Sequence, residues 1–465
     1  MRIAATRSEK VAENTIVWFR RDLRTRDMPT FLAAAAAAEQ ALGVFVLDPA
    51  LLGPAGAHRV AALHACLRDL DRQLGGKLLV VEGEPIRVIP GLAEAIGASQ
   101  VHVSADFGPY GAARDEQIAE KIDLVRTGSP FAVSPGRVVK QDGSPYRVFT
   151  PFYRSWLDHG WRKPAKTDAS TVAWLDPEDV RQFRRAELPD EEPVCAVGED
   201  AAQRQWRKFL KADGGGVNEY HANRDRPDLD DTSRMSVHLK FGTIHPRTML
   251  ADLATIDSDG AREYRRQLAW RDFYGDVLHH NPDSARRNLD RKFDAMPLDS
   301  GDEAWRCFRA WCDGETGYPI VDAGMRQLRA EGWMHNRVRM IVASFLVKDL
   351  HLPWWWGARH FMRYLVDGDL PANQHGWQWV AGSGTDASPF FRIFNPVTQG
   401  KKFDPDGEYV RRWVPELRNI DGAKVHTVGE RGEDVTGYPA PIVDHAEERK
   451  EALARYDEVK AASAN

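Results

Sequence analysis

The sequence predicts two structural halves: an α/β N-terminal domain with a doubly wound parallel sheet, and an all-α C-terminal domain. In residues 15–135, short apolar runs of strand length alternate with helical stretches. This alternation is typical of parallel strands joined by right-handed crossovers. After Ala201 the strand patterns fade and helical periodicity dominates. The chain has 465 residues, and at roughly 150 residues per domain this length allows about three domains or two large ones.

The predicted strands of the N-terminal half are short and apolar, and they cover residues 16–19, 43–47, 78–81 and 101–103. Helices are expected between them at residues 29–42, 58–74, 86–96 and 111–124. The first has Pro29 near its start and Gly43 directly after its end, the usual asymmetry of helix boundaries. Such sheets bind ligands beyond the carboxyl ends of their strands. Neither a G-x-G-x-x-G loop nor a Walker lysine loop follows the first strand, so a common dinucleotide or nucleotide site is not indicated.

The C-terminal half contains predicted helices at residues 201–210, 261–277, 320–328, 335–350, 356–365 and 446–460. Residues 157–200 carry four prolines and the acidic run 190–192, and are predicted to form a long surface connection. The sequence therefore divides into an α/β domain at residues 1–138, a linker at 139–200 and a helical domain at 201–465.

Composition excludes several classes of protein. The four cysteines are too few for a disulfide scaffold and match no zinc spacing, so we expect reduced thiols and no metal site. The N-terminal segment 1–14 is charged and lacks the apolar core of a secretory signal. A run of about 18 apolar residues that could span a membrane is absent from the sequence. These features predict a cytoplasmic protein.

The formal net charge of −5 argues against a generally basic nucleic-acid binder, but it permits a local basic patch. The chain has 15 Trp and only 11 Tyr, and many of the tryptophans lie between residues 270 and 379. Segments 323–348 and 391–413 are rich in Arg and Lys. Basic residues interleaved with aromatic ones are typical of a groove that follows phosphates and stacks bases. Buried core tryptophans and solvated helix faces are the alternative interpretation.

Three short patterns in the helical half indicate a ligand site. Asn336 and Met340 lie four residues apart on one predicted helix face, with Arg337 beside them, and this set suits a flat heteroaromatic ligand. The hydroxyl-rich segment 232–236 contains one cation and suits a diphosphate, although such residues more often cap helices. The loop 367–373 holds two carboxylates and an amide, which could form an acid–base pair or a turn that contacts arginines or a ligand.

These motifs together resemble the photolyase/cryptochrome family, and most closely its class I cyclobutane pyrimidine dimer photolyases. The similarity extends from Ile16 to about Leu417 and includes VWFRRDLR at 17–24, TSRMS at 232–236, GWMHNRVRM at 332–340 and DGDLPANQHGWQW at 367–379. The resemblance implies light-driven repair of UV-damaged DNA by a monomer that holds FAD in its helical domain. In that reaction excited FADH⁻ passes an electron to a flipped-out thymine dimer, the cyclobutane ring splits and the electron returns, with no net redox change.

The resemblance also implies which residues hold the flavin. Those expected on its phosphate side are Tyr220, Thr232, Ser233, Arg234, Met235 and Ser236. Those expected around the rest are Gln267, Arg271, Asn336, Arg339, Asp367, Asp369 and Asn373, and Arg339 is similar to the family arginine that pairs with the acid at Asp367. Asn373 falls where the family faces flavin N5. A neutral amide there suits an anionic reduced flavin better than a carboxylate would, because a nearby like charge disfavours the anion.

A second set of residues matches the family pocket for the DNA dimer: Gln267, Trp270, Arg271, Asn336, Arg337, Met340, Trp379 and Arg392. Gln267 departs from the family pattern, which has glutamate there, so we expect repair to be possible but slower. Glutamine at this position also resembles the (6-4) photolyases. Those carry histidine at the positions of Asn336 and Met340, so the (6-4) interpretation is rejected.

Two further family features are less complete in this sequence. The tryptophan chain for flavin photoreduction maps to Trp377 and Trp354, but its surface member falls on Gly301, and Trp305 is the nearest candidate. The glutamate that binds folate in one subgroup maps to Gly111, whereas residues 106–115 resemble the 8-hydroxy-5-deazaflavin subgroup. A deazaflavin antenna is therefore favoured over methenyltetrahydrofolate or an empty antenna site.

A cryptochrome-like photoreceptor and a flavin oxidoreductase are the two alternatives to DNA repair. A cryptochrome-like blue-light photoreceptor would bind flavin but signal through a partner, and Asn373 together with the intact dimer pocket favours repair. A flavin oxidoreductase would need a hydride-acceptor site, and the sequence supplies none that we recognise.

Overall fold

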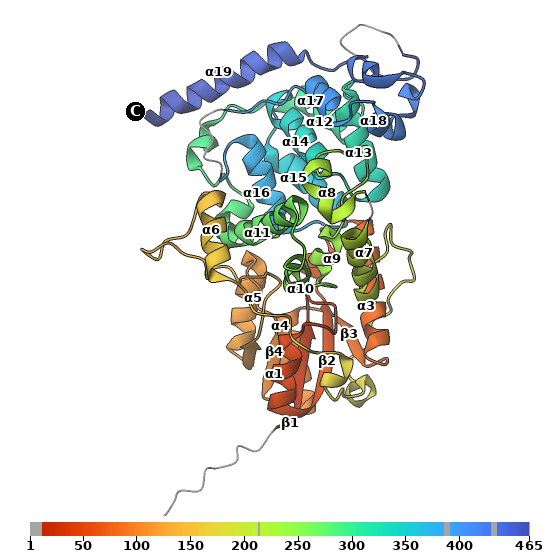
Figure 1. Ribbon diagram of the computed structural model, residues 1–465. Helices are drawn as coiled ribbons and strands as arrows, with labels where there is room; N and C mark the ends of the chain where they lie inside the picture. Colours follow the sequence, from red (N-terminus) through yellow and green to blue (C-terminus); the bar gives the residue numbers. More distant parts are fainter. Residues whose placement is uncertain (1–11, 213, 386–390, 429–434, 465) are drawn as a thin grey trace, which may run out of the picture.

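The computed structural model describes residues 12–464 except 213, 386–390 and 429–434. Most of the charged segment 1–14, for which no secretory signal is predicted, lies outside the described residues. A parallel sheet with its helices forms one end of the molecule, and the helical half forms the other (Figure 1). Within the described residues no helix combines the length and apolar character needed to cross a bilayer.

The sheet has five parallel strands in the order β3-β2-β1-β4-β5. They are β1 (Ala12–Phe19), β2 (Ala38–Leu47), β3 (Leu78–Glu82), β4 (Gln100–Val103) and β5 (Asp123–Arg126). The chain moves outward from β1 in one direction and then in the other, so the predicted doubly wound fold is confirmed. The switch point lies between β1 and β4, where such sheets bind ligands.

Alternate side chains of β1 point to opposite faces of the sheet. Because the side chains on both faces are apolar, helices cover both faces and bury them. Ile16 and Trp18 pack in one buried cluster with residues of α4 (Pro85–Ile96) and α5 (Pro109–Ala119). Val17 and Phe19 pack in another with residues of α1 (Pro29–Ala37) and α3 (Ala57–Gln73). The short helix α2 is Pro49–Leu52.

Two predicted helices were too long. The helix expected at 29–42 ends at Ala37, and Ala38 begins β2, which pairs with β1 from Ala12 onward. Helix propensity is a weak prior that tertiary pairing overrides, and here the backbone of Ala41 also bonds to residues 173 and 175. The helix expected at 111–124 ends at Ala119, and its last residues belong to the edge strand β5, which the sequence analysis missed.

The prediction that residues 157–200 form a surface connection was wrong for their central part. Val172, Trp174 and Val180 are buried. Trp174 packs against Phe19 and Phe31, with ring centroids 6.2 and 5.1 Å away. The central part of this segment therefore packs against the sheet beside β2. Neither its proline content nor its charge predicts this packing.

The regular elements described after β5 are all helical. The α-helices are α6 (Phe149–His159), α7 (Glu199–Lys211), α8 (Gly216–Asn223), α9 (Ser236–Phe241), α10 (Pro246–Leu253), α11 (Asp259–His280), α12 (Gly301–Asp313), α13 (Pro319–Glu331), α14 (Asn336–Lys348), α15 (Trp354–Tyr364), α16 (Leu370–Ala381), α17 (Pro396–Phe403), α18 (Glu408–Trp413) and α19 (His445–Ala464). The predicted all-α C-terminal half is confirmed.

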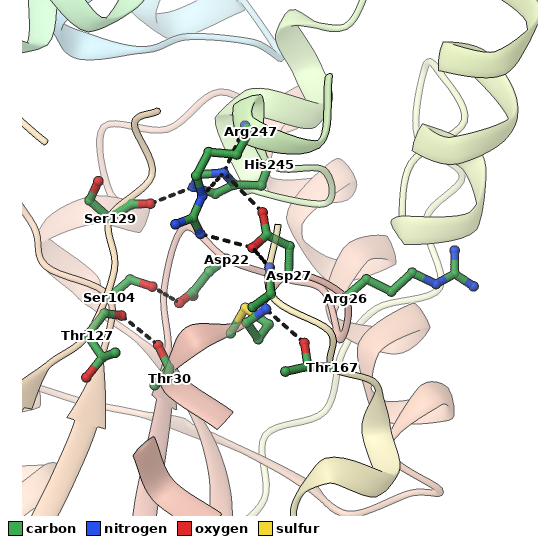
Figure 2. A network of polar contacts seen from close by, with 12 residues as sticks. Asp22, Arg26, Asp27, Thr30, Ser104, Thr127, Ser129, Thr167, His245 and Arg247 are labelled. Carbon is green, nitrogen blue, oxygen red and sulfur yellow. Dashed lines mark hydrogen bonds and ion pairs between the residues drawn. The ribbon is translucent and has the colours of Figure 1, made fainter. Parts of the chain in front are cut away.

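A buried polar network joins the two halves at the carboxyl edge of the sheet (Figure 2). Asp27 accepts from Arg247 of α10 at 3.0 Å and from the Ala165 amide at 2.7 Å. The His245 Nδ1 atom accepts from the backbone amide of Arg247 at 3.1 Å, so its Nε2 proton is directed to the Ser129 carbonyl at 2.8 Å. Burial lowers the pKa of His245 well below its usual value. A neutral imidazole thus fixes the start of α10 against the segment after β5, and Arg247 fixes it against the loop after β1.

Candidate functional site

The predicted site residues Arg339 and Asp367 form a direct ion pair. Arg339 lies in the first turns of α14, and its Nη2 atom is 2.9 and 3.2 Å from the two carboxylate oxygens of Asp367. Its Nε atom also donates to the carbonyl of Met334 at 2.8 Å. Asp367 is 5% exposed. The pair fixes α14 to the loop that precedes α16.

The second carboxylate of this loop, Asp369, lies among cations. Its side chain caps α16 and forms an ion pair with Arg21, which follows β1. Burial alone would raise the pKa of Asp369, but Arg21, Arg271 and Lys240 together lower it to about 2. Burial and the nearby Arg21 lower the pKa of Lys240 to about 7, although Asp369 opposes the shift. Cations thus outnumber carboxylates here, which suits an anionic ligand.

The hydroxyl-rich loop before α9 supplies polar groups of a different kind. The hydroxyl of Ser233 contacts that of Tyr264 at 2.7 Å. The Oγ1 atom of Thr232 is buried and has no hydrogen-bond partner in the described part of the chain. A buried hydroxyl without a partner is unusual in a native protein and is satisfied when a ligand supplies the missing partner.

Other residues predicted for this side lie close to the same loop. Arg234 has a left-handed backbone (φ 50°), pairs with Asp230 at 2.7 Å and lies over the Trp333 ring at 4.2 Å. Met235 is buried, whereas Ser236 is exposed at the start of α9. The Tyr220 ring is 4.9 Å from that of Tyr264, and burial raises the pKa of Tyr220 to about 12.

The side-chain amide of Asn373 has a defined orientation. Its Nδ2 atom donates to the carbonyl of Ala358 at 3.1 Å and to the side-chain oxygen of Gln374 at 2.8 Å. A carbonyl cannot donate, so the amide nitrogen and not the oxygen faces Ala358. Both amide protons are therefore used, and the Oδ1 atom remains as an acceptor.

The dimer-pocket residues on α11 and α14 are linked by a chain of charges. Gln267 donates to Glu263 at 2.8 Å, and Glu263 in turn pairs with Arg224. Arg224 contacts Asp225 at 3.8 Å, and Asp225 pairs with Arg337 at 2.8 Å. The pocket residues Gln267 and Arg337 thus belong to one polar surface.

Aromatic side chains form the other part of the predicted pocket. Trp270 is half-buried and stacks on Phe149 of α6, with 3.7 Å between ring centroids and 8° between planes. The Trp379 ring has the Arg392 guanidinium 5.3 Å above it. The exposed amide of Asn336 is 3.8 Å from the sulfur of Met340, as expected for one helix face.

Arg271, predicted for both the flavin and the dimer, is held by backbone. It donates to the carbonyls of Pro130 at 2.7 Å and Leu239 at 3.3 Å. Burial lowers its pKa, and Asp369 opposes this shift. Its contact with Pro130 ties α11 to the segment that follows β5.

The three tryptophans predicted for electron transfer differ in their surroundings. Trp377 is 3% exposed, and its Nε1 atom lacks a hydrogen-bond partner among the described residues. Trp354 is buried, and its Nε1 atom donates to Asn288 at 2.9 Å. Trp305 is 49% exposed and stacks on Trp356, with ring centroids 4.3 Å apart.

A second polar cluster lies at the switch point of the sheet, at the proposed antenna segment. Arg20 pairs with Asp115 at 2.6 Å, and Arg114 contacts both Asp115 at 2.8 Å and Asp106 at 3.4 Å. Burial would raise the pKa of Asp106, but the surrounding arginines outweigh it and lower the value. A Cβ atom at Gly111 would lie 2.1 Å from an Asp106 oxygen, so this position cannot carry a side chain without displacing Asp106.

Sequence reasoning assigned no role to several residues that the fold brings to the site. Lys240 and Arg21 join the Asp369 cluster, and Phe149 stacks on Trp270. Arg21 lies in the VWFRRDLR motif, but no local pattern predicts its contact with Asp369 or singles out Lys240 and Phe149, because their partners lie far along the chain. The described residues contain no group of three or more His, Cys, Asp or Glu side chains placed to hold a metal ion.

Comparison with known proteins agrees with this geometry. The family described as "DNA photolyase" matches residues 15–170, and the "FAD binding domain of DNA photolyase" matches residues 264–458. The Streptomyces griseus protein named deoxyribodipyrimidine photo-lyase is 40% identical, with 93% of this chain and 97% of that protein covered. Its Halobacterium salinarum counterpart is 38% identical, with 96% and 99% covered.

Solved structures show the same relationship. A bacterial class III photolyase from Agrobacterium tumefaciens has a TM-score of 0.86 at 36% identity, and 99% of this chain and 100% of that chain are covered. A Synechocystis cryptochrome has a TM-score of 0.84 at 25% identity, with 96% and 99% covered. Because curated relatives are 38–40% identical over nearly its full length, the chain belongs to the DNA photolyase/cryptochrome family.

Proposed function

We propose that the protein repairs cyclobutane pyrimidine dimers in DNA with the energy of blue light. Deoxyribodipyrimidine photo-lyase activity is supported by curated relatives of that name that match almost the whole chain. Within the site the proposal is supported by Asn373, whose two amide protons are both donated and whose Oδ1 atom would therefore be left to accept from flavin N5. The proposal is a lyase reaction with no net redox change.

The residues present fit an FAD. The buried Thr232 hydroxyl lacks a partner, and Thr232, Ser233, Arg234, Met235, Ser236 and Tyr220 would hold the phosphate side of the cofactor. Arg271, Arg339, Asp367 and Asp369 would surround the rest, with Gln267 and Asn336 at its dimer-facing side. When bound and reduced, the flavin supplies the light-excited electron that splits the dimer.

Asn373 would select the reduced state of this cofactor. Both of its amide protons are engaged, so Oδ1 can accept a hydrogen bond from a protonated N5, which the reduced flavin carries. A neutral acceptor adds no negative charge beside an anionic ring. Arg339 is placed to contribute positive charge while it holds Asp367.

The dimer would be bound between aromatic and polar walls. Trp270 and Trp379 provide ring faces, and stacking of a base on an aromatic side chain is worth about 1–3 kcal/mol. Asn336, Arg337, Met340 and Gln267 would read the dimer edge, and Arg271 would support α11. Arg392, which lies over Trp379, would contact a phosphate of the same strand.

A deazaflavin antenna is our proposal for the switch point of the sheet. Position 111 has glycine where one subgroup has the glutamate that binds folate, and a side chain there would have to displace Asp106. The archaeal photolyase from Sulfolobus tokodaii is described with two FAD molecules, which imply a novel light-harvesting cofactor in that protein. It matches at 30% identity with a TM-score of 0.82, covering 96% of this chain and 100% of that chain. A second flavin is therefore the alternative that extraction and chromatography of the bound chromophores would distinguish.

A cryptochrome-like photoreceptor is not favoured. The curated relatives with repair names are 34–40% identical, whereas the Synechocystis cryptochrome is 25% identical. The deciding experiment is blue-light exposure of the reduced, flavin-loaded protein with an oligonucleotide that contains one thymine dimer. We expect intact thymines to reappear under light and not in darkness. A protein with bound reduced flavin that restores no thymine would refute the repair function.

A further inference from the structure

A continuous series of aromatic rings connects buried Trp377 with the protein surface. Trp377 contacts Trp311 of α12 with 6.1 Å between ring centroids, and Trp311 stacks on Phe308 at 5.9 Å and 17°. Phe308 contacts Trp356 of α15 at 5.2 Å. Trp356 stacks on Trp305 at 4.3 Å and 21°, and Trp305 is 49% exposed.

The fold holds these rings in place from several sides. Trp305, Phe308 and Trp311 recur every three residues on α12, so they share one side of that helix. Trp311 is fully buried and donates to the Val342 carbonyl at 3.0 Å. A Cβ atom at position 357 would lie 2.1 Å from the Trp377 ring, so Gly357 permits the close packing of α15 against Trp377.

The route suggested by the family resemblance lacks its last member in this chain. Its surface position is Gly301, which begins α12 and has no side chain. Trp354, its middle member, packs against Trp355 at 5.9 Å and donates to Asn288. An electron that reached Trp354 would therefore find no indole at position 301.

We infer that electrons from an external thiol enter at Trp305 and reach Trp377 through Trp356 and Trp311, with Phe308 as a bridging ring. The inference rests on the proposed function, because it takes Trp377 to lie beside the flavin. Electronic coupling falls off steeply with distance, so rings in contact exchange electrons fastest. Phenylalanine is much harder to oxidise than tryptophan, so Phe308 transmits coupling without itself losing an electron.

The surroundings of the indoles give the transfer a direction. When Trp377 loses one electron to the photoexcited oxidised flavin, the electron vacancy moves outward from indole to indole. The Nε1 atom of Trp377 is buried without an acceptor and that of Trp311 faces a carbonyl, so neither passes its proton to water. Trp305 is half exposed and can release its proton to solvent, which stabilises the vacancy at the surface.

The thiol then completes the reaction. A thiolate gives one electron to the Trp305 radical, which regains its proton from water. Two such events convert two thiols to one disulfide, with release of two protons and two electrons. The two electrons and one of these protons would convert bound FAD to FADH⁻, and the other proton goes to solvent. Atoms and charges therefore balance with the thiol as the reductant.

The test is photoreduction of the flavin in the full-length, flavin-loaded protein. Oxidised protein with dithiothreitol is illuminated with blue light under anaerobic conditions, and the loss of oxidised-flavin absorbance is followed. We expect Trp305→Phe, Trp356→Phe and Trp311→Phe each to lose most of the photoreduction rate. Phe308→Leu should slow photoreduction, and Phe308→Trp should match or exceed the wild-type rate.

Trp355→Phe is the matched control, since Trp355 is half-buried in the same Trp-Trp-Trp run but lies outside the ring series. Transient absorption supplies a second readout, because the long-lived deprotonated tryptophan radical should be absent in Trp305→Phe. Flavin content and circular dichroism identify variants that fail to fold. Wild-type rates in both Trp305→Phe and Trp356→Phe, or a loss confined to Trp354→Phe, would overturn the inference.

Failure of this route is distinguishable from failure of the proposed function. Flavin reduced chemically with dithionite no longer needs the ring series. Trp305→Phe and Trp356→Phe should then repair thymine dimers as the wild type does. Absence of repair in the chemically reduced wild type would instead contradict the photolyase function and leave the photoreduction result intact.

Discussion

The carboxylate of Asp369 forms an ion pair with the guanidinium of Arg21, 348 residues earlier in the chain. Asp369 caps the helix that carries Asn373 and Trp377, whereas Arg21 follows the first strand of the sheet. The contact therefore joins the proposed flavin site to the switch point where we place the antenna. A partly buried ion pair therefore lies between the two chromophore sites that we propose on different domains.

Asp369→Asn should destabilise the protein at neutral pH. The pKa of Asp369 is lowered from 3.8 to about 2, which corresponds to about 2 kcal/mol of folding free energy at about 1.4 kcal/mol per unit. A depressed carboxyl pKa stabilises the fold above its unfolded value, and this contribution is lost as the pH falls from 3.8 toward 2. Urea unfolding should show a difference that is constant from pH 7 to 5 and shrinks below about pH 4. Exposed Asp259→Asn is the control, and an equal loss there would contradict the prediction.

Lys240→Met should make the unliganded protein more stable at pH 7. Burial lowers the pKa of Lys240 from 10.5 to about 7. Between these two pH values Lys240 is protonated in the unfolded chain and mostly unprotonated in the folded chain. The stability of the wild type should therefore rise between pH 7 and pH 10 relative to the variant. Thermal unfolding across this range measures the effect. A pH-independent difference between the two proteins would show that Lys240 titrates normally.

Trp270→Ala should lose selectivity for damaged DNA while it retains FAD. Removal of one stacking ring costs about 1–3 kcal/mol, or roughly a 5- to 150-fold loss of affinity. Binding of thymine-dimer and undamaged oligonucleotides, compared at one salt concentration, measures the selectivity. Flavin absorbance reports cofactor retention. Loss of FAD together with selectivity would mean that Trp270 supports the cofactor and not the dimer.

Gln267→Glu should keep or raise the repair yield. The new carboxyl would lie at the position from which Gln267 donates to Glu263 at 2.8 Å. The carboxylate of Glu263 raises the pKa of a carboxyl group at position 267, so its protonated form can donate to the dimer. The gain in repair yield over the wild type should therefore be largest at low pH. Repair yield per absorbed photon across pH 6–8 checks this. A clear fall in yield at pH 6 would refute the view that glutamine is the weaker residue.

Asn373→Asp should make the reduced flavin easier to reoxidise. A carboxylate at this position would place negative charge beside an anionic ring, and it would also lose the donor that Ala358 now accepts. The rate of flavin reoxidation in air, followed by absorbance, should increase relative to the wild type. Asn419→Asp, on an exposed side chain to which we assign no role in the site, controls for a general charge effect. An unchanged reoxidation rate would remove Asn373 from the cofactor site.

Much of the fold could be predicted because it depends on local patterns. The strands at residues 16–19 and 78–81 and the helix at residues 261–277 were recognised from apolar runs and helical period alone. The errors occurred where partners far along the chain decide. Ala38 leaves its helix to pair with Ala12, and β5 forms because β4 offers an edge. An alanine-rich or mixed segment carries no local signal of such pairing.

The same division applies to the site. The residue types and order by themselves determined the family, the two-domain fold and the candidate residues, because the motifs are long and their helical spacing is local. Tertiary structure alone decided that Arg21, Lys240 and Arg271 surround Asp369, and that Asn373 donates both amide protons to Ala358 and Gln374. It also decided that a series of ring contacts through Trp311, Phe308 and Trp356 joins Trp377 to Trp305. Burial, charge proximity and ring contact are properties of neighbours in space, and the chain order does not specify which neighbours those are.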